Sequence, residues 1–301
     1  MRVVAALGGN ALLERGERPD SGIQQGHVAS AVAALAPLAS DHELIITHGN
    51  GPQVGMLAME SARDPALSRP YPFDVLGAQT QGMIGYWLVQ ALQNALPGRL
   101  AGCLICRTLV SADDPAFADP VKFVGPVYDE ATARQLAAEY DWQVRQDGDA
   151  WRRVVPSPEP VELLDLPLII ELLGAGAIMV CAGGGGVPVI TDAAGTMRGV
   201  EAVIDKDLTA ALLARSVHAE VLLLLTDVES VQENFGTARA RSIQLATPGD
   251  LRARPFPAGS MGPKVDAACR FVEATGGMAA IGRLDDAEAM LHRKAGTIVA
   301  R

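Results

Sequence analysis

Short apolar runs alternate along the chain with longer stretches in which apolar residues recur at helical spacing. Most of the short runs are near-continuous, which is typical of strands that are buried on both faces of a parallel sheet. We predict strands at 3–7, 44–47, 100–107, 177–182, 221–226, 278–282 and 297–300. We predict helices at about 24–39, 52–61, 74–96, 161–174, 207–216, 263–275 and 285–293. This order predicts an α/β fold with a mainly parallel sheet between helices.

One segment interrupts the alternation of strands and helices. Residues 114–160 are polar, rich in proline, and contain Trp142 and Trp151. Such a segment between two regular units suggests an inserted lobe or lid, although a long surface loop without function has a similar composition. The length of 301 residues allows either one large domain or two small ones.

The charge balance argues against several classes of partner. The chain has 25 basic and 35 acidic side chains, a net charge of -10, and no basic run, which disfavours binding to a nucleic-acid backbone. Apolar runs are too short for a membrane-spanning helix of about 20 residues, and the first residues do not resemble a secretory signal. We therefore expect a soluble cytoplasmic protein without a membrane partner.

The four cysteines, Cys103, Cys106, Cys181 and Cys269, fit a reducing compartment. The stretch CLIC at 103–106 has the spacing of a redox or metal motif. On a strand, however, that spacing points the two thiols to opposite faces, and no second pair completes a zinc site. We therefore predict apolar packing for the cysteines. Because the five histidines are also scattered, we predict no metal held by the protein alone.

Glycine is concentrated at four places that follow predicted strands. In parallel sheets, ligands bind at the carboxyl ends of the strands, where loops lead into helix N-termini and glycine lets a ligand approach the backbone. The clusters are Gly8, Gly9 and Asn10; Gly49, Asn50 and Gly51; Gly183 to Gly186; and Gly259 to Gly262. Their backbone N–H groups predict a site for phosphates or a carboxylate. Each cluster alone is equally typical of a tight turn.

Two familiar phosphate motifs are not found. The chain lacks G-x-x-x-x-G-K-[ST], and GNGPQVG has Val54 where G-x-G-x-x-G requires glycine. A P-loop NTPase or a Rossmann dehydrogenase is therefore disfavoured.

Lysine is rare, and its positions are informative. Arginine supplies all basic side chains except Lys122, Lys206, Lys264 and Lys294. The first lies in the segment 114–160, and the next two lie beside an acidic pair and a glycine cluster. An ammonium is a compact, mobile charge that suits a phosphoryl group in motion. Chance retention on solvated faces is the alternative, and we favour it for Lys294, near a predicted helix end.

Asp205 and Asp207 flank Lys206, and the following LTAALLA has helical character. A carboxylate at the start of a helix often simply caps it. The adjacent lysine suggests a further role, in which Asp207 holds lysine ammoniums in position and Asp205 assists nucleotide-bound Mg²⁺.

Taken together, these segments resemble the carbamate kinases of the amino acid kinase family. The matching stretches, in order, are ALGGNAL, ITHGNGPQVG, YPFDVLGAQTQGMIGY, KFVGPVY, WRRVVPSPEP, CAGGGGVPV, GVEAVIDKDL and GSMGPKVDAACRFVE. The resemblance implies a single-domain αβα sandwich, a small protruding lid subdomain at 114–160, and a homodimer. It also implies a reversible, Mg²⁺-dependent reaction of ATP with carbamate to give ADP and carbamoyl phosphate, often run toward ATP in arginine metabolism.

The resemblance assigns roles to individual residues. Catalytic roles fall on Lys122, Lys206 and Lys264, with Asp207 as their organiser. Substrate binding falls on Gly8, Gly9, Asn10, Gly49, Asn50 and Gly51. Nucleotide binding falls on Gly183, Gly184, Gly185, Asp205, Asp227, Met261 and Gly262.

One stretch departs from the family pattern. In TDVESVQENFG, Glu229 and Gln232 stand where the family usually has aspartate and tyrosine. We therefore expect the packing of adenine near Gln232, and with it the nucleotide affinity or preference, to differ from the family pattern. Two alternative functions therefore stay open. One is another acyl-phosphate kinase of the same fold, such as an acetylglutamate kinase, and the other is a catalytically silent nucleotide-binding sensor.

Overall fold

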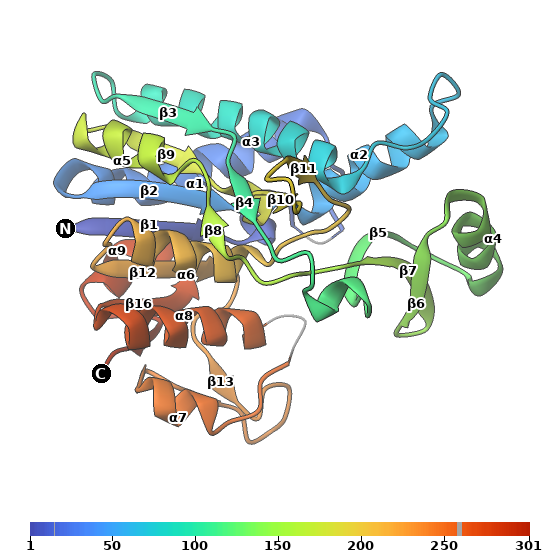
Figure 1. Ribbon diagram of the computed structural model, residues 1–301. Coiled ribbons are helices and arrows are strands. Elements are labelled where there is room, and N and C mark those ends of the chain that lie inside the picture. The colour runs from blue at the N-terminus through green and yellow to red at the C-terminus, as the bar shows by residue number, and fades with distance from the viewer. Residues whose placement is uncertain (15, 258–260) are drawn as a thin grey trace.

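The computed structural model describes residues 1–14, 16–257 and 261–301, and the side chain of Asn10 lies outside this description. Over these residues, the main sheet has the strand order β15-β17-β16-β12-β1-β2-β9-β3 (Figure 1). The bounds are β1 (Arg2–Leu7), β2 (Glu43–His48), β3 (Ala101–Leu104), β9 (Ile178–Cys181), β12 (Val221–Thr226), β15 (Leu245–Ala246), β16 (Met278–Arg283) and β17 (Thr297–Val299). Paired neighbours run parallel except β16 and β17. The predicted mainly parallel sheet is confirmed.

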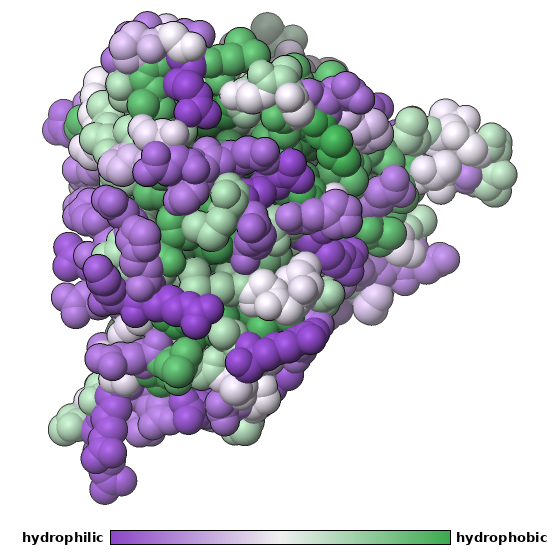
Figure 2. Space-filling view, turned by 90° about the vertical axis from the view of Figure 1, so that its left-hand side faces the viewer, coloured by the Kyte–Doolittle hydropathy of each residue, from purple (hydrophilic) through white to green (hydrophobic). Residues whose placement is uncertain are grey.

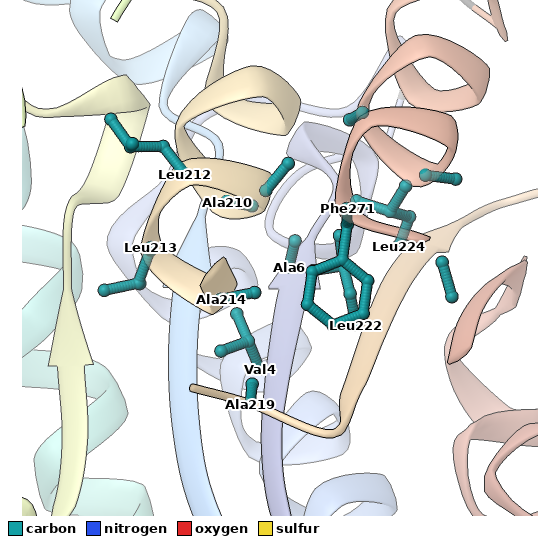
Figure 3. Packing of buried hydrophobic residues seen from close by; sticks show 14 of the residues in the cluster. Val4, Ala6, Ala210, Leu212, Leu213, Ala214, Ala219, Leu222, Leu224 and Phe271 are labelled. Carbon is teal, nitrogen blue, oxygen red and sulfur yellow. The ribbon is translucent and has the colours of Figure 1, made fainter. Parts of the chain in front are cut away.

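Helices cover both faces of this sheet. On one face lie α5 (Leu166–Gly174), α6 (Lys206–Ser216) and α8 (Met261–Thr275), and on the other lie α1 (Ser21–Asp41), α3 (Phe73–Ala95) and α9 (Ala287–Leu291). Successive strand residues enter opposite cores, so Val4 and Ala6 pack with the first group of helices and Val3 and Ala5 with the second. Figure 3 shows Ala210 and Phe271, from α6 and α8, beside Val4 and Ala6. This double burial explains the near-continuous apolar runs.

The predicted strand 100–107 is wrong in one respect, because it is two strands. The chain leaves β3 at Leu104, and β4 (Arg107–Leu109) joins a second sheet of order β11-β10-β4-β8. The other members of that sheet are β8 (Glu162–Leu163), β10 (Val187–Thr191) and β11 (Met197–Gly199). At the break, the side-chain amide of Gln81 accepts from the Cys106 N–H at 2.9 Å and donates to the Cys106 carbonyl at 3.2 Å. The CLIC stretch therefore does not lie on one strand.

Several predicted helix boundaries also need correction. The helix predicted at 161–174 begins at Leu166, because residues 162–163 pair with β4, and Pro167 then fits the first turn of the helix. The helix predicted at 285–293 is shorter, since a 3-10 turn at Leu284–Asp286 precedes α9. The first helix begins earlier than predicted, at Ser21.

The segment 114–160 contains a small folded unit, here called the protruding unit (residues 122–155). It comprises β5 (Lys122–Tyr128), α4 (Glu130–Tyr140), β6 (Gln143–Asp147) and β7 (Ala150–Val155), with antiparallel strands in the order β5-β7-β6. Figure 1 shows it projecting to the right of the main body. At its base, Val124 and Val155 pack against Phe73 and Leu76 of α3 and Val54 of α2 (Gly51–Arg63).

The two chain ends lie at the left of Figure 1, where β1 and β2 begin. Figure 2 shows this side of the molecule, which is mainly hydrophilic with small apolar areas between the polar side chains. A wide hollow of about 1040 Å³ lies here, and its lining includes Met1, Glu220 and Gly277, which lie just before β1, β12 and β16. This hollow is thus at the opposite strand ends from the predicted glycine loops. No helix among the described residues is long and apolar enough to cross a membrane.

Candidate active site

The first two glycine loops meet at the carboxyl ends of the neighbouring strands β1 and β2. A Cβ atom on Gly49 would stand 3.0 Å from the amide nitrogen of Gly9 and 3.4 Å from the Cδ atom of Lys206. Only a residue without a side chain allows this approach of backbone to backbone. The N–H of Gly49 donates to the Leu7 carbonyl at 3.0 Å, so Gly49 supplies space here rather than an anion donor.

The third loop lies against the second. After β9, Ala182 has the left-handed backbone conformation with φ 53°, and the chain turns through Gly183 to Gly186. A Cβ atom on Gly183 would stand 2.2 Å from Nε2 of His48, and one on Gly184 would stand 2.2 Å from the amide nitrogen of Asn50. The structure therefore brings this loop beside the loop predicted to bind substrate.

The fourth cluster follows a helix, contrary to the prediction that it follows a strand. Residues Gly259 and Ser260 lie outside the described part of the chain, and α8 begins at Met261. The preceding regular element is α7 (Pro248–Arg252). The Gly262 N–H donates to the Pro257 carbonyl at 2.8 Å, which joins the start of α8 to the chain that leads into it.

Two of the predicted lysines share one buried carboxylate. Lys206 donates to Oδ1 of Asp207 at 2.6 Å, and Lys264 donates to Oδ2 at 3.1 Å. Asp207 is 4% exposed, and the side chains of both lysines are 15% exposed. The two ammoniums come from α6 and α8, 58 positions apart in the sequence, and are held together by the carboxylate between them.

The charges of this cluster perturb one another. Burial lowers the pKa of Lys206, and the nearby Lys264 charge lowers it further, while Asp207 acts in the opposite direction. Burial by itself would raise the pKa of Asp207, but the two lysines outweigh burial, and the net shift is downward. The carboxylate is therefore ionised at neutral pH and stabilises the charged form of Lys206.

Asp205 joins the third lysine to the same helix end. Its Oδ1 accepts from the N–H groups of Asp207 at 2.9 Å and Leu208 at 3.4 Å, which caps α6. Its Oδ2 accepts from Lys122 of β5 at 2.9 Å. All three predicted catalytic lysines thus contact acidic side chains at the N-terminus of one helix, close to the glycine loops.

The predicted nucleotide residue Asp227 lies at the end of β12, next to the first glycine loop. A Cβ atom on Gly8 would stand 3.7 Å from the Cα atom of the preceding residue, Thr226. The Thr226 hydroxyl donates to the Asp227 carboxylate at 3.1 Å. Gln232, in the stretch that departs from the family pattern, begins β13 (Gln232–Glu233), which pairs with β14 (Arg241–Ser242).

His48 is a component of the site to which the sequence assigned no role. The ring is 1% exposed, and its Nδ1 lies 2.9 Å from the carbonyl oxygen of Gly49. Burial lowers the pKa of His48 to about 4, despite the hydrogen bond to Gly49, and the Lys206 charge acts in the same direction as burial. The ring is therefore neutral at pH 7, with its proton on Nδ1 because a carbonyl only accepts. Its position directly before Gly49 was the one signal available in the sequence.

Buried hydroxyl groups also hold the loops, and their pairing was not predicted. Thr108 and Thr209 both donate to the Gly185 carbonyl, at 2.9 and 3.1 Å. Thr80 of α3 accepts from the Asn50 side chain at 2.9 Å. Within the described residues, no group of three or more His, Cys, Asp or Glu side chains is placed to hold a metal ion.

Fold and site together define a class of protein. The chain belongs to the amino acid kinase family, whose model matches residues 1–281. Carbamate kinase from Rhizobium meliloti (strain 1021) is 50% identical to it over 303 residues, covering 99% of this chain and 93% of that protein. Carbamate kinase from Escherichia coli (strain K12) is 48% identical over 297 residues, covering 99% of this chain and 98% of that protein.

Solved structures agree with this membership. Carbamate kinase from Giardia lamblia bound to AMP-PNP superimposes with a TM-score of 0.92 at 36% identity, covering 99% of this chain and 98% of that one. The isopentenyl phosphate kinase of T. acidophilum superimposes with a TM-score of 0.55 at 14% identity. The second likeness shows a shared fold alone.

Proposed function

We propose that this protein transfers a phosphoryl group reversibly between ATP and carbamate, giving ADP and carbamoyl phosphate, as its carbamate kinase relatives are named for doing. The observation that carries this proposal is the meeting of Lys122, Lys206 and Lys264 at the acidic N-terminus of α6. Three cations beside glycine loops match the charge that develops on a phosphoryl group in transfer.

The reaction requires positioning and charge neutralisation more than proton transfer. Carbamate is already an anion, so its attack on the γ-phosphorus needs no general base. Lys206 and Lys264 offset charge on the phosphoryl oxygens, and Asp207 fixes both ammoniums and favours the charged form of Lys206. The backbone of the first two loops lies against the acceptor, and Gly49, which lacks a side chain, lets the Gly9 backbone and Lys206 pack close together there.

The segment 114–160 acts as a lid within a single domain of residues 1–301. Its Lys122 pairs with Asp205 and would move to the phosphoryl group when substrates bind, while the lid excludes water. Oδ2 of Asp205 would then be available to hold the Mg²⁺ that comes with the nucleotide. Mg²⁺ usually binds through substrate phosphates and one or two carboxylates, and it neutralises phosphate charge.

ATP or ADP lies on the side of Asp227, Met261 and Gly262, at the ends of β12 and α8. The nucleotide role that the resemblance implies for Gly183, Gly184 and Gly185 stays a prediction. The first two pack on His48 and Asn50, so we assign this loop to the support of the substrate loop.

The same packing bears on the choice of acceptor. His48 and Asn50 fill the space at which Gly183 and Gly184 would carry side chains. This close packing suits a small acceptor such as carbamate better than acetylglutamate.

The test measures ATP formation from ADP and carbamoyl phosphate with Mg²⁺, with acetyl phosphate as a parallel donor. A forward assay offers ATP with carbamate or with N-acetylglutamate. We expect transfer with carbamoyl phosphate and carbamate only. Transfer to N-acetylglutamate would support the alternative kinase, and ADP binding without transfer from any donor would support the silent sensor.

Two further proposals follow from the family. The first is that the protein forms a homodimer. An apolar surface for it lies at the end of the main sheet, at β3 and the exposed Tyr86 and Ile105 beside it. Sedimentation at several concentrations tests this. A cytoplasmic location, in arginine metabolism, agrees with four cysteines that are all free thiols.

A further inference from the structure

The underside of the protruding unit carries an arginine that contacts the main body. Arg153 lies in β7, and its side chain is 12% exposed. Its guanidinium lies over the ring of Phe73, 4.8 Å from the ring centroid, and over the ring of Trp142, at 4.3 Å. Phe73 begins α3 of the body, whereas Trp142 belongs to the protruding unit. The arginine is thus stacked between an aromatic ring of each part.

A carboxylate of the body completes this contact. Glu201 accepts a hydrogen bond from the Arg153 guanidinium through one oxygen. Its other oxygen accepts from the Phe73 N–H at 2.8 Å, at the start of α3. The Glu201 side chain is 42% exposed, but its bond to the Phe73 N–H fixes the carboxylate, so it offers the arginine a partner of defined position.

Glu201 belongs to the segment that leads directly into the catalytic helix. Residues 200–205 connect β11 to α6, and we call them the docking segment. The protruding unit and Pro156, the residue that follows it, contact this segment at three successive points: Arg153 with Glu201, the Pro156 carbonyl with the Val203 N–H at 3.0 Å, and Lys122 with Asp205 at 2.9 Å. The next residues along the chain are Lys206 and Asp207.

The strand pairing relates Arg153 to Lys122. In the register of β5 and β7, Val124 pairs with Arg153 and Lys122 pairs with Val155. The side chain of Arg153 is therefore held two residue pairs from the lysine that reaches the site. A shift of β7 relative to the docking segment would displace Lys122 from the same helix end.

We propose that Arg153 and Glu201 are positioning residues that hold the lid on the docking segment and thereby place Lys122 at the reacting phosphoryl group. Neither residue touches substrate. Their contact fixes the position of β5 relative to the N-terminus of α6. When the contact is lost, Lys122 is still present but lies in the wrong place. This inference rests on the proposed carbamate kinase reaction, in which Lys122 contacts the phosphoryl group. A site held 1 Å too loosely loses much of its rate without losing its fold.

The test is a double-mutant cycle between the contact and the lysine. Arg153→Met and Glu201→Gln are each made in the wild-type chain and in a Lys122→Ala chain, and kcat for ATP formation is measured with a luminescent ATP assay that follows slow variants. In the wild-type chain we expect each change to lower kcat by about 10-fold or more, with KM for ADP within about threefold. In the Lys122→Ala chain we expect each to cost less than about twofold, because the lysine they position is gone.

The matched control is Arg145→Met. Arg145 is an arginine of the same unit that pairs with Asp119, within the segment 114–160, and it makes no hydrogen bond or ion pair with the main body among the described residues. Its variant is expected to stay within about twofold of wild type. An equal fold-loss for Arg153→Met with and without Lys122 would overturn the proposal, since it would indicate a structural role alone. No loss in either chain would overturn it as well.

Hydrogen exchange provides a readout that does not depend on activity. The Val203 N–H is expected to exchange faster in Arg153→Met and Glu201→Gln than in wild type or Arg145→Met. Unchanged exchange at Val203 would refute the docking contact even if the wild-type protein proved inactive with carbamoyl phosphate. That inactivity would by itself contradict the proposed function, so the two failures are distinguishable. Glu201→Gln, an isosteric change in the body, keeps the test valid if Arg153→Met folds poorly.

Discussion

Replacing Asp207 by asparagine tests the arrangement of the two lysines most directly. The side chain keeps its shape, but the carboxylate that bonds Lys206 at 2.6 Å and Lys264 at 3.1 Å becomes neutral. The amide N–H groups also face one of the two ammoniums, and an ammonium has no acceptor for them. Two positive charges then lie close together at a position that is 4% exposed in the wild-type protein.

The magnitude follows from this burial. Removal of one partner from a buried ion pair costs about 3–5 kcal/mol, because an uncompensated charge is left in the interior. Part of that cost is avoided if a lysine loses its proton. Burial already lowers the pKa of Lys206, and Asp207 is the main group that opposes this shift. In Asp207→Asn the pKa of Lys206 therefore falls further.

The pH dependence has a defined sign. A lysine with a lowered pKa is charged only below that pKa, so kcat of Asp207→Asn should be lowest at high pH and recover as the pH falls. At about pH 8 we expect a loss of about 100-fold or more, the effect of one preorganised charge contact. Between the lowered pKa of Lys206 in the folded variant and its ordinary pKa in the unfolded chain, the unfolded chain binds more protons than the folded one. Stability of the variant should therefore increase with pH in that window, more steeply than in wild type.

The assay measures kcat for ATP formation and the thermal midpoint from about pH 6 to about pH 9. The control is Asp266→Asn on α8, because Asp266 also contacts two cations, Arg252 at 3.2 Å and Arg270 at 2.8 Å, but is 31% exposed. Exposed pairs contribute about 0–1 kcal/mol, so this control should keep its activity. A pH profile and thermal midpoint of Asp207→Asn equal to those of wild type would refute the reasoning.

Three further predictions concern the lysines and the loops. Lys264→Ala should lower kcat about 100-fold, and a variant within a few-fold of wild type would remove Lys264 from the mechanism. Gly184→Ala should lose activity and stability, because φ is +64° there and the new Cβ would stand 2.2 Å from the side-chain amide of Asn50. The control is Gly195→Ala, where φ is +80° and no atom lies within 4 Å, so the variant should lose only the backbone cost of about 1 kcal/mol in stability. Burial lowers the pKa of His48 from 6.5 to about 4, so the folded protein should lose about 3 kcal/mol of stability as the pH falls from above 6.5 toward 4. In acid titrations, His48→Gln should flatten this dependence.

Local pattern was sufficient for the central sheet and for the choice of candidate residues. The runs at 3–7 and 44–47 became β1 and β2 because near-continuous apolar sequence has few alternatives to a strand covered on both faces. The rarity of lysine singled out Lys206 and Lys264 before any distance was known. Resemblance to the family then supplied their expected roles.

Other elements depended on contacts that are distant in sequence. The strand predicted at 100–107 broke because Gln81 of α3 binds the backbone of Cys106, and residues 162–163 left their predicted helix to pair with β4. Periodicity does not encode either contact. Short strands gain most of their stability from partners that the folded chain brings to them.

The sequence by itself determined the fold class and the residue types at the site, since these depend on local pattern and composition, and its resemblance to known segments indicated the family. Tertiary structure decided which charges meet. Asp207 bonds two lysines, Asp205 caps α6 while it pairs with Lys122, and Arg153 stacks between two rings. Electrostatic interaction depends on distance and burial, which arise only when separate segments pack together.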